Sequence, residues 1–243
     1  MPGGNLTRRL FVAAGAAAGA VLSLLRPRRA PAAPLESTDI PEAAPASSAY
    51  RFFTAAEARF ITAAVARLIP KDELGAGAVE AGVPVFIDRQ LAGDYGRGAH
   101  FYLQAPFTPG EKTQGWQMQA PAEVYRSTIA QLNRYTADAL GKAFADLSAE
   151  QQDTVLKGME ASTVQLKGSV KADAFFELLL QNTLEGFFAD PMYGGNRDMA
   201  GWKLLGFPGA RYDQREFVSR HGEPYPLPPV ALHGRPEWNR QRT

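Results

Sequence analysis

Apolar side chains recur with the spacing of an α-helix at the start of the globular part of this chain. Thr54 and Glu57 form a capping box, in which the threonine oxygen and the glutamate carboxylate each satisfy a free amide of the first turn. An apolar stripe continues to Ile69, and Pro70 ends it because proline cannot continue a helix. A second helix is predicted with Pro84 in its first turn, a position that proline suits. Its buried side is expected to consist of Val85, Phe86, Ile87 and Leu91.

Three more helices follow the same pattern. One is predicted over residues 121–140 with Gly141 as its C-cap, and the next begins at a second capping box, at Ser148, and continues to Met159. A fifth helix, capped by Asp173, carries apolar residues around most of its circumference, as a helix buried on several sides does. No segment alternates apolar and polar residues over more than a few positions. The pattern predicts an all-α fold, a single irregular helical domain of about five to six helices with long loops.

The fifth helix runs into a turn-rich stretch, residues 185–209, around which the other elements are organised. Asp190 and Pro191 stop the helix, because proline disfavours helical conformation in the residue before it, and we expect Asp190 to cap the turn. Residues 194–196, Gly-Gly-Asn, tolerate positive φ and allow the chain to reverse sharply. They lack the spacing of a dinucleotide-binding loop and follow a helix rather than a strand, so no nucleotide site is predicted.

This stretch, EGFFADPMYGGNRDMAGWKLLGFPG, resembles the signature of the small (third) subunit of the membrane-bound gluconate 2-dehydrogenase family. Residues 52–70, 81–93 and 174–183 resemble the same family. The resemblance implies a mainly helical subunit that accompanies a large FAD-dependent dehydrogenase and a multihaem cytochrome c subunit. It implies a complex that oxidises D-gluconate to 2-dehydro-D-gluconate and passes the electrons to the cytochrome. FAD and haem c are then expected in the partner subunits, and no cofactor in this chain.

The signature combines aromatic, soft apolar and basic side chains on turns, a mixture that is enriched at protein interfaces. The expected contacts to the large subunit are Tyr193, Asn196, Arg197, Trp202, Lys203 and Phe207. Two interpretations of Arg197 stay open: an internal bond to a carboxylate that fixes its own turn, or a contact with the partner. Residues 93–115, a loop rich in glycine and aromatic residues, are a further candidate for a docking or structural role.

Residues 1–33 have the pattern of an export signal. Arg8 and Arg9 lie in TRRLFV, which resembles the twin-arginine motif, and the apolar segment at residues 10–25 is shorter than the roughly 20 residues of a membrane span. We expect export by the twin-arginine translocase to the periplasm, with association to the inner membrane through the complex. An uncleaved N-terminal anchor is the alternative. Because this pathway carries folded proteins, the signal also suggests that the chain escorts its flavin subunit.

Composition sets the remaining boundaries. Residues 34–49 are rich in Pro, Ala and Ser and carry too little apolar surface to fold, which predicts a disordered linker before a helical domain over residues 50–210. Residues 211–243 are predicted to be an extended C-terminal arm, because four prolines between positions 224 and 229 favour a polyproline-like backbone. Such an arm lies either in a partner's groove or free in solvent.

The 243 residues include no cysteine, which excludes disulfides, thiolate-bound iron–sulfur clusters and covalent c-type haem in this chain. The 26 basic and 25 acidic residues balance, so nucleic acid is not an expected partner. The three histidines are far apart and no metal-ligand spacing is present, so we predict no catalytic and no metal site. The sequence thus favours a non-catalytic subunit. The alternative is an independent exported helical enzyme or binding protein whose site is not recognisable.

Overall fold

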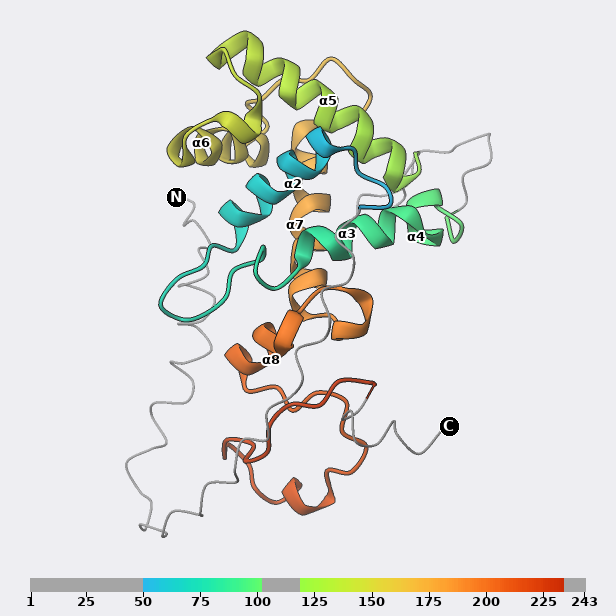
Figure 1. The fold of residues 1–243 in the computed structure, drawn as a ribbon, viewed down its shortest axis with the longest axis vertical. Coiled ribbons are helices and arrows are strands. Elements are labelled where there is room, and N and C mark those ends of the chain that lie inside the picture. The colour runs from blue at the N-terminus through green and yellow to red at the C-terminus, as the bar shows by residue number, and fades with distance from the viewer. Residues whose placement is uncertain (1–49, 102–118, 234–243) are drawn as a thin grey trace. The chain divides into compact units, whose positions relative to one another are not determined.

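The computed structural model of the chain describes residues 50–101 and 119–233 (Figure 1). Within these ranges the fold is all-α, as predicted, and only isolated β-bridges accompany the helices. The α-helices of the described residues are α2 (Ala55–Leu68), α3 (Val83–Ala92), α4 (Asp94–Arg97), α5 (Pro121–Leu140), α6 (Ala149–Glu160), α7 (Ala172–Phe188) and α8 (Ala200–Leu205). Short 3-10 turns are η2 (Phe144–Asp146), η3 (Pro191–Tyr193), η4 (Arg197–Met199) and η5 (Arg215–Phe217).

The helix ends follow the local sequence signals. The hydroxyl of Thr54 accepts the amide of Glu57 at 3.4 Å, while the Glu57 carboxylate accepts the amide of Thr54 at 2.8 Å. Ser148 and Gln151 make the same reciprocal pair at the start of α6, at 3.3 and 3.0 Å. Gly141 ends α5 in the left-handed region, with a φ of 73°. Both predicted capping boxes and the predicted C-cap are therefore confirmed.

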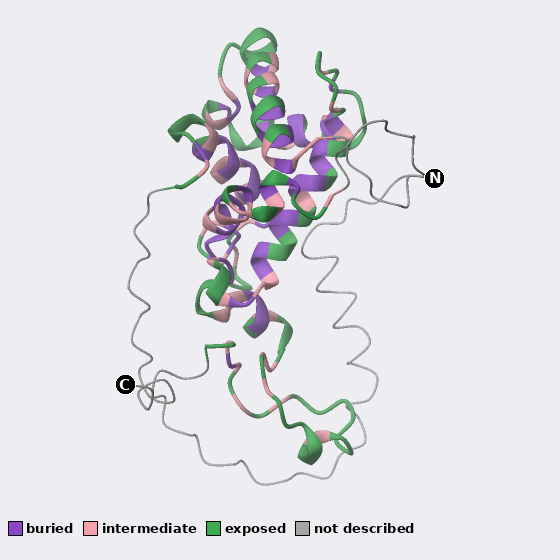
Figure 2. Ribbon diagram, turned by 90° about the vertical axis from the view of Figure 1, so that its right-hand side faces the viewer, coloured by how far each residue is buried: buried purple, intermediate pink, exposed green. Residues whose placement is uncertain are grey.

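Helix α7 lies at the centre of the helical body and contacts α2, α3, α5, α6 and α8 (Figure 1). Buried residues concentrate in the interior of the helical body (Figure 2), and the buried residues of α7 lie on several sides of that helix. This arrangement explains why its apolar residues surround the helix instead of forming one stripe. The largest fully buried side chains are Phe60, Ile61, Val65, Ile87, Tyr125, Ile129, Leu132, Phe144, Met159, Phe175, Leu179 and Phe187.

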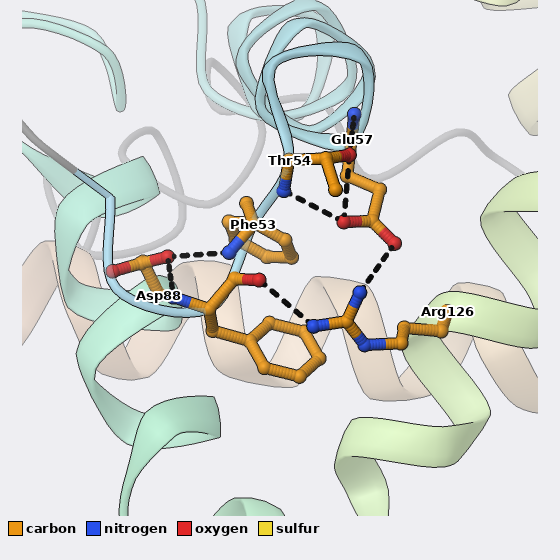
Figure 3. A network of polar contacts seen from close by, with 6 residues as sticks. Phe53, Thr54, Glu57, Asp88 and Arg126 are labelled. Atoms are coloured by element: carbon orange, nitrogen blue, oxygen red, sulfur yellow. Dashed lines mark hydrogen bonds and ion pairs between the residues drawn. The ribbon is translucent and has the colours of Figure 1, made fainter.

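A buried carboxylate fixes the first residues of the body (Figure 3). Asp88 of α3 is 2% exposed and accepts the backbone amides of residues 51–53 at 2.7 to 2.9 Å. Arg126 of α5 stacks on the ring of Phe52 at 4.3 Å and donates to its carbonyl oxygen at 2.9 Å. The chain that enters α2 is thus held by α3 and α5 together, which the sequence pattern did not predict.

Two details differ from the sequence-based expectation. The N-cap of α7 is Lys171, and Asp173 lies inside the first turn, where its carboxylate accepts the Ser162 hydroxyl and the Ala174 amide at 2.7 and 2.8 Å. An acidic residue in the first turn still satisfies a free amide and suits the positive end of the helix dipole. The loop expected at residues 93–115 begins with a regular turn of helix, α4, which contacts α3 and α5.

Several predictions concern residues outside the described ranges: the export signal with Arg8 and Arg9, the linker 34–49, residues 102–115 of the predicted loop, and residues 234–243 of the predicted arm. In the part of the chain that the structure describes, none of the helices has the length and apolar character needed to cross a bilayer.

Residues 50–211 and 225–233 belong to one compact body, and the segment Tyr212–Pro224 is a separate unit. In that segment the carboxylate of Asp213 pairs with the guanidinium of Arg215 at 2.7 Å, and Arg220 lies over the ring of Phe217 at 5.2 Å.

Candidate docking site

The signature stretch folds back tightly against the end of α7, and its glycines make this possible. A Cβ atom at Gly195 would overlap the backbone of Gly186, and one at Gly201 would overlap the carbonyl oxygen of Phe187. Gly186 itself is pressed against Phe86 of α3, whose ring would lie 2.7 Å from an added Cβ. The spacing of these glycines therefore reflects close backbone packing rather than a phosphate-binding loop.

Asn196 holds the two sides of the fold-back together. Asn196 is fully buried, and its backbone is in the left-handed region, with a φ of 44°. The amide nitrogen donates to the carbonyl oxygen of Ala189 at 2.8 Å, and the amide oxygen accepts the backbone N–H of Gly201, also at 2.8 Å. A side chain with one donor and one acceptor is required here, because it bridges the end of α7 to the first turn of α8.

Trp202 lies inside the same fold-back. Its side chain is 6% exposed, and its indole nitrogen donates to the carbonyl oxygen of Phe188 at 2.8 Å. This bond satisfies one of the carbonyl groups that the end of a helix leaves without a partner. Phe207 packs edge-on against the indole at 5.3 Å between ring centroids but is itself 47% exposed.

Arg197 and Asp198 form the exposed tip of the turn. The backbone N–H of Arg197 donates to the carbonyl oxygen of Ala81 at 2.9 Å, which ties the turn to the segment before α3. Among the described residues no carboxylate forms a salt bridge with the Arg197 guanidinium. Asp198 and Met199 both have positive φ, at 56° and 55°, and each such non-glycine residue costs of order 1–2 kcal/mol.

Asp190 caps the turn, as predicted, and also binds a segment near the C-terminal end of the described residues. One carboxylate oxygen accepts the amide of Met192 at 3.0 Å, and the other accepts the amide of Leu232 at 2.6 Å. Residues 225–233, which we call the return segment, thereby join the signature. Gly209 forms a parallel bridge with Val230 of the return segment, and Val230 is 5% exposed.

Large apolar side chains are exposed around this fold-back. The exposed fractions lie between 41% and 62% for Met192, Tyr193, Leu205, Phe207 and Leu232. All five are carried by segments that are bonded to, or packed on, the C-terminal end of α7 or Asp190, two residues beyond it. Exposed apolar side chains gathered at one end of a domain are typical of an interaction surface.

The six predicted contact residues fall into two groups. Asn196 and Trp202 are buried within the chain and make hydrogen bonds to its own backbone. The exposed ones are Tyr193, Arg197, Lys203 and Phe207. The buried pair builds the turns, and the exposed four are displayed on them. Leu232, which was not among the predicted residues, has no local sequence signal because its partner Asp190 lies 42 positions away.

A second polar cluster lies between α4, α5 and α7. Tyr125 and Tyr95 both donate to the side-chain oxygen of Asn182, at 2.8 and 3.2 Å, and the Asn182 nitrogen donates to Glu185 at 3.0 Å. Burial raises the pKa of the fully buried Tyr125 well above its ordinary value, and burial also raises the pKa of Tyr95. Every polar atom of this cluster that is named here has a partner in the chain, so the cluster fixes the packing of α7.

Two other kinds of site were considered in the described ranges, metal sites and surface depressions. No group of three or more His, Asp or Glu side chains there has the geometry to hold a metal ion. A shallow depression of about 530 Å³ lies along the small side chains of α2 and is lined by Tyr50, Ala55, Ala58, Arg59, Thr62, Ala63, Ala66 and Ala145.

The fold and the site together define a class of protein: an all-helical domain whose last long helix ends in a glycine-rich fold-back that displays apolar and basic side chains. The chain belongs to the gluconate 2-dehydrogenase subunit 3 family, whose model matches residues 55–209, well over half of the sequence. The match ends at Gly209, the residue that pairs with the return segment. Comparison with curated proteins and with solved structures gave no match.

Proposed function

We propose that the chain is the non-catalytic small subunit of a periplasmic, membrane-associated FAD-dependent dehydrogenase complex. The complex oxidises D-gluconate to 2-dehydro-D-gluconate, and a multihaem cytochrome c subunit receives the electrons. The single observation that carries this proposal is the family match, which spans the helical body from α2 to the end of the signature. FAD and haem c belong to the partner subunits in this proposal.

The way the chain uses its polar groups supports an accessory role. The buried side chains of Asp88, Asn182, Asp190 and Asn196 each bond to other groups of the same chain. Catalytic groups, in contrast, must face a space that a substrate can enter. In the described residues these buried polar side chains hold the backbone and the helices in place.

We assign contact with the flavoprotein subunit to the exposed residues of the signature: Tyr193, Arg197, Lys203 and Phe207. Asn196 and Trp202 position them from within. Arginine and aromatic residues frequently dominate the binding energy of an interface. Because no internal carboxylate pairs with Arg197 in the described ranges, the geometry favours the interpretation in which this guanidinium meets the partner.

The chain also serves as an escort during export. The motif with Arg8 and Arg9 resembles a twin-arginine signal, and this pathway carries folded proteins. A flavoprotein that folds around FAD in the cytoplasm and lacks a signal of its own would then cross the membrane together with this subunit.

The double variant Arg8→Lys, Arg9→Lys tests the escort role. We expect both this chain and the flavoprotein to stay in the cytoplasm and periplasmic dehydrogenase activity to disappear. The matched control is Arg28→Lys with Arg29→Lys, which alters two arginines of the same segment outside the motif. Undiminished periplasmic activity in the first variant would contradict the escort role.

A further inference from the structure

We propose that the return segment, residues 225–233, completes the docking surface for the flavoprotein subunit, with Asp190 as the residue that positions it. This inference rests on the proposed function and deepens it. The family match ends before the return segment begins, so the segment is assigned here from the geometry alone.

The return segment is anchored to the signature by backbone pairing. Ala210 donates to the carbonyl oxygen of Val230 at 2.7 Å, and Val230 donates to the carbonyl oxygen of Pro208 at 3.2 Å. Gly209 lies between these bonds, and a Cβ atom there would overlap the carbonyl oxygen of Val230. The guanidinium of Arg211 also donates to the carbonyl oxygen of Pro228 and lies 5.3 Å from the ring of Tyr225. The segment is therefore a packed part of the body.

Asp190 joins this segment to the turn that displays Met192 and Tyr193. Its carboxylate is 8% exposed, and its two oxygens accept one amide from each side, Met192 and Leu232. Because a single carboxylate binds both amides, the backbones of Met192 and Leu232 are held close together. An amide side chain at this position could accept only one of the two bonds.

The segment presents an apolar side chain beside those of the signature. Leu232 is 62% exposed, whereas Val230, two residues earlier, is buried. The other exposed large apolar residues of the body outside this region lie on four different segments: Tyr50, Leu74, Leu140 and Leu184. The concentration of exposed apolar area at the fold-back, enlarged by Leu232, is what a protein partner would cover.

The charges around this surface indicate the chemistry of the partner. Arg197 and Lys203 are exposed, and Arg89 lies against the turn, since a Cβ atom at Gly194 would lie 2.6 Å from its guanidinium. No salt bridge within the described residues neutralises these three cations, and Asp198 is the acidic residue at the tip. The proposed function identifies the occupant as the flavoprotein subunit, and these cations predict that the flavoprotein presents an apolar patch with an acidic rim to this surface.

Two glycines offer a matched test. Both Gly206 and Gly209 have positive φ, at 69° and 76°, so alanine strains the backbone similarly at either position. An alanine side chain meets nothing within 4 Å at position 206 but collides at position 209 with the backbone of Val230 and with the ring of Trp202. In the co-expressed complex we expect Gly209→Ala to weaken binding of the flavoprotein at least tenfold and Gly206→Ala to change it less than threefold.

A second pair of variants keeps the test valid if Gly209→Ala disturbs folding. Leu232→Glu adds a charge to the proposed surface, and Leu140→Glu adds the same charge at the end of α5, where the leucine is 40% exposed. We expect both variants to melt like the unmodified subunit. Only Leu232→Glu should weaken binding of the flavoprotein, again at least tenfold.

The outcomes separate this inference from the proposed function. If the unmodified full chain does not retain a flavoprotein, the proposed function fails. If the unmodified chain retains it and both Gly209→Ala and Leu232→Glu bind it equally well, the docking surface is wrong. A selective loss of the cytochrome subunit, or of self-association of this chain, would also overturn the assignment of the flavoprotein as the occupant.

Discussion

The indole nitrogen of Trp202 donates to the carbonyl oxygen of Phe188 across 2.8 Å, so the tryptophan of the signature closes the end of α7 from inside the domain. With 6% of its surface exposed, Trp202 offers a partner almost no contact area of its own. In the proposed interface Trp202 therefore acts indirectly, because it supports Phe207, which packs on its ring and is exposed.

Trp202→Ala is therefore expected to destabilise the subunit itself. Truncation of a buried tryptophan costs about 3–5 kcal/mol, because apolar contacts are lost and a cavity remains. Trp202→Phe keeps most of the ring volume but leaves the Phe188 carbonyl without its donor, at about 1–3 kcal/mol. Thermal unfolding of both variants measures the two effects. A Trp202→Ala subunit that melts normally and yet loses its partner would show that the indole is a direct contact.

Gly195→Ala is expected to disrupt the fold-back, because an added Cβ overlaps the backbone of Gly186, which cannot move aside as a side chain can. We expect a loss of stability of more than about 3 kcal/mol, the size of other severe core disruptions. Gly93→Ala is the control, since the added atom meets neighbours only at the ordinary distance of 3.5 Å. Equal melting temperatures for the two variants would contradict the described packing of the signature.

Asp88→Asn tests the bonds by which the Asp88 carboxylate holds the backbone amides of residues 51–53, just before α2 (Figure 3). Asparagine keeps one acceptor oxygen but turns an N–H group toward a backbone amide, so one of the three bonded amides loses its acceptor. The expected cost is about 1–3 kcal/mol, measured by urea unfolding, with faster proteolysis near residue 50. Asp146→Asn, which breaks only an exposed ion pair with Arg59, should cost less than about 1 kcal/mol. Equal urea midpoints for Asp88→Asn and Asp146→Asn would show that the bonds of Asp88 to these amides do not stabilise the fold.

Tyr125 gives the fold a sensitivity to alkaline pH. Burial raises its pKa in the folded protein, so above about pH 10 the unfolded chain loses this proton while the folded chain keeps it. The free energy of unfolding should thus fall as the pH rises above about 10. The Tyr125→Phe variant lacks the bond to Asn182, so its free energy of unfolding at neutral pH should be about 1 kcal/mol lower than that of the unmodified protein. Above about pH 10 its free energy of unfolding should fall less steeply than that of the unmodified protein. Tyr212→Phe, at a 98% exposed position, is the control and should leave the profile unchanged.

The helices were predictable because their signals are local. The two capping boxes, Gly141 and the apolar periodicity each act within a few residues, and α5 has the predicted bounds, residues 121–140. The turn at Asp190 was predictable for the same reason, since proline follows it directly. Even here, Asp173 was predicted to be the N-cap, whereas it lies two positions after the N-cap Lys171, because the first turn of a helix accepts an acidic residue at several positions.

The contacts that build the candidate site were not predictable, because they join distant residues. Asp88 binds backbone amides more than 30 positions away, and Asp190 binds an amide 42 positions away. Neither bond leaves a periodic signal in the sequence. The burial of Trp202 was likewise hidden, since aromatic residues on turns are common both in cores and at interfaces. Only the folded backbone of the glycine-rich turns shows that Trp202 lies in the core and not at the surface.

Purification of the tagged full chain from its native membranes, under conditions that keep complexes intact, tests the central claim most directly. The account predicts that a flavoprotein and a multihaem cytochrome c co-purify with the chain, identified by mass spectrometry, flavin and haem absorbance, and gluconate-dependent reduction of the haem. It also predicts that the chain alone, once separated and refolded, shows no flavin absorbance. Recovery of the chain without a flavoprotein, or with stoichiometric flavin bound to the isolated chain, would contradict the account.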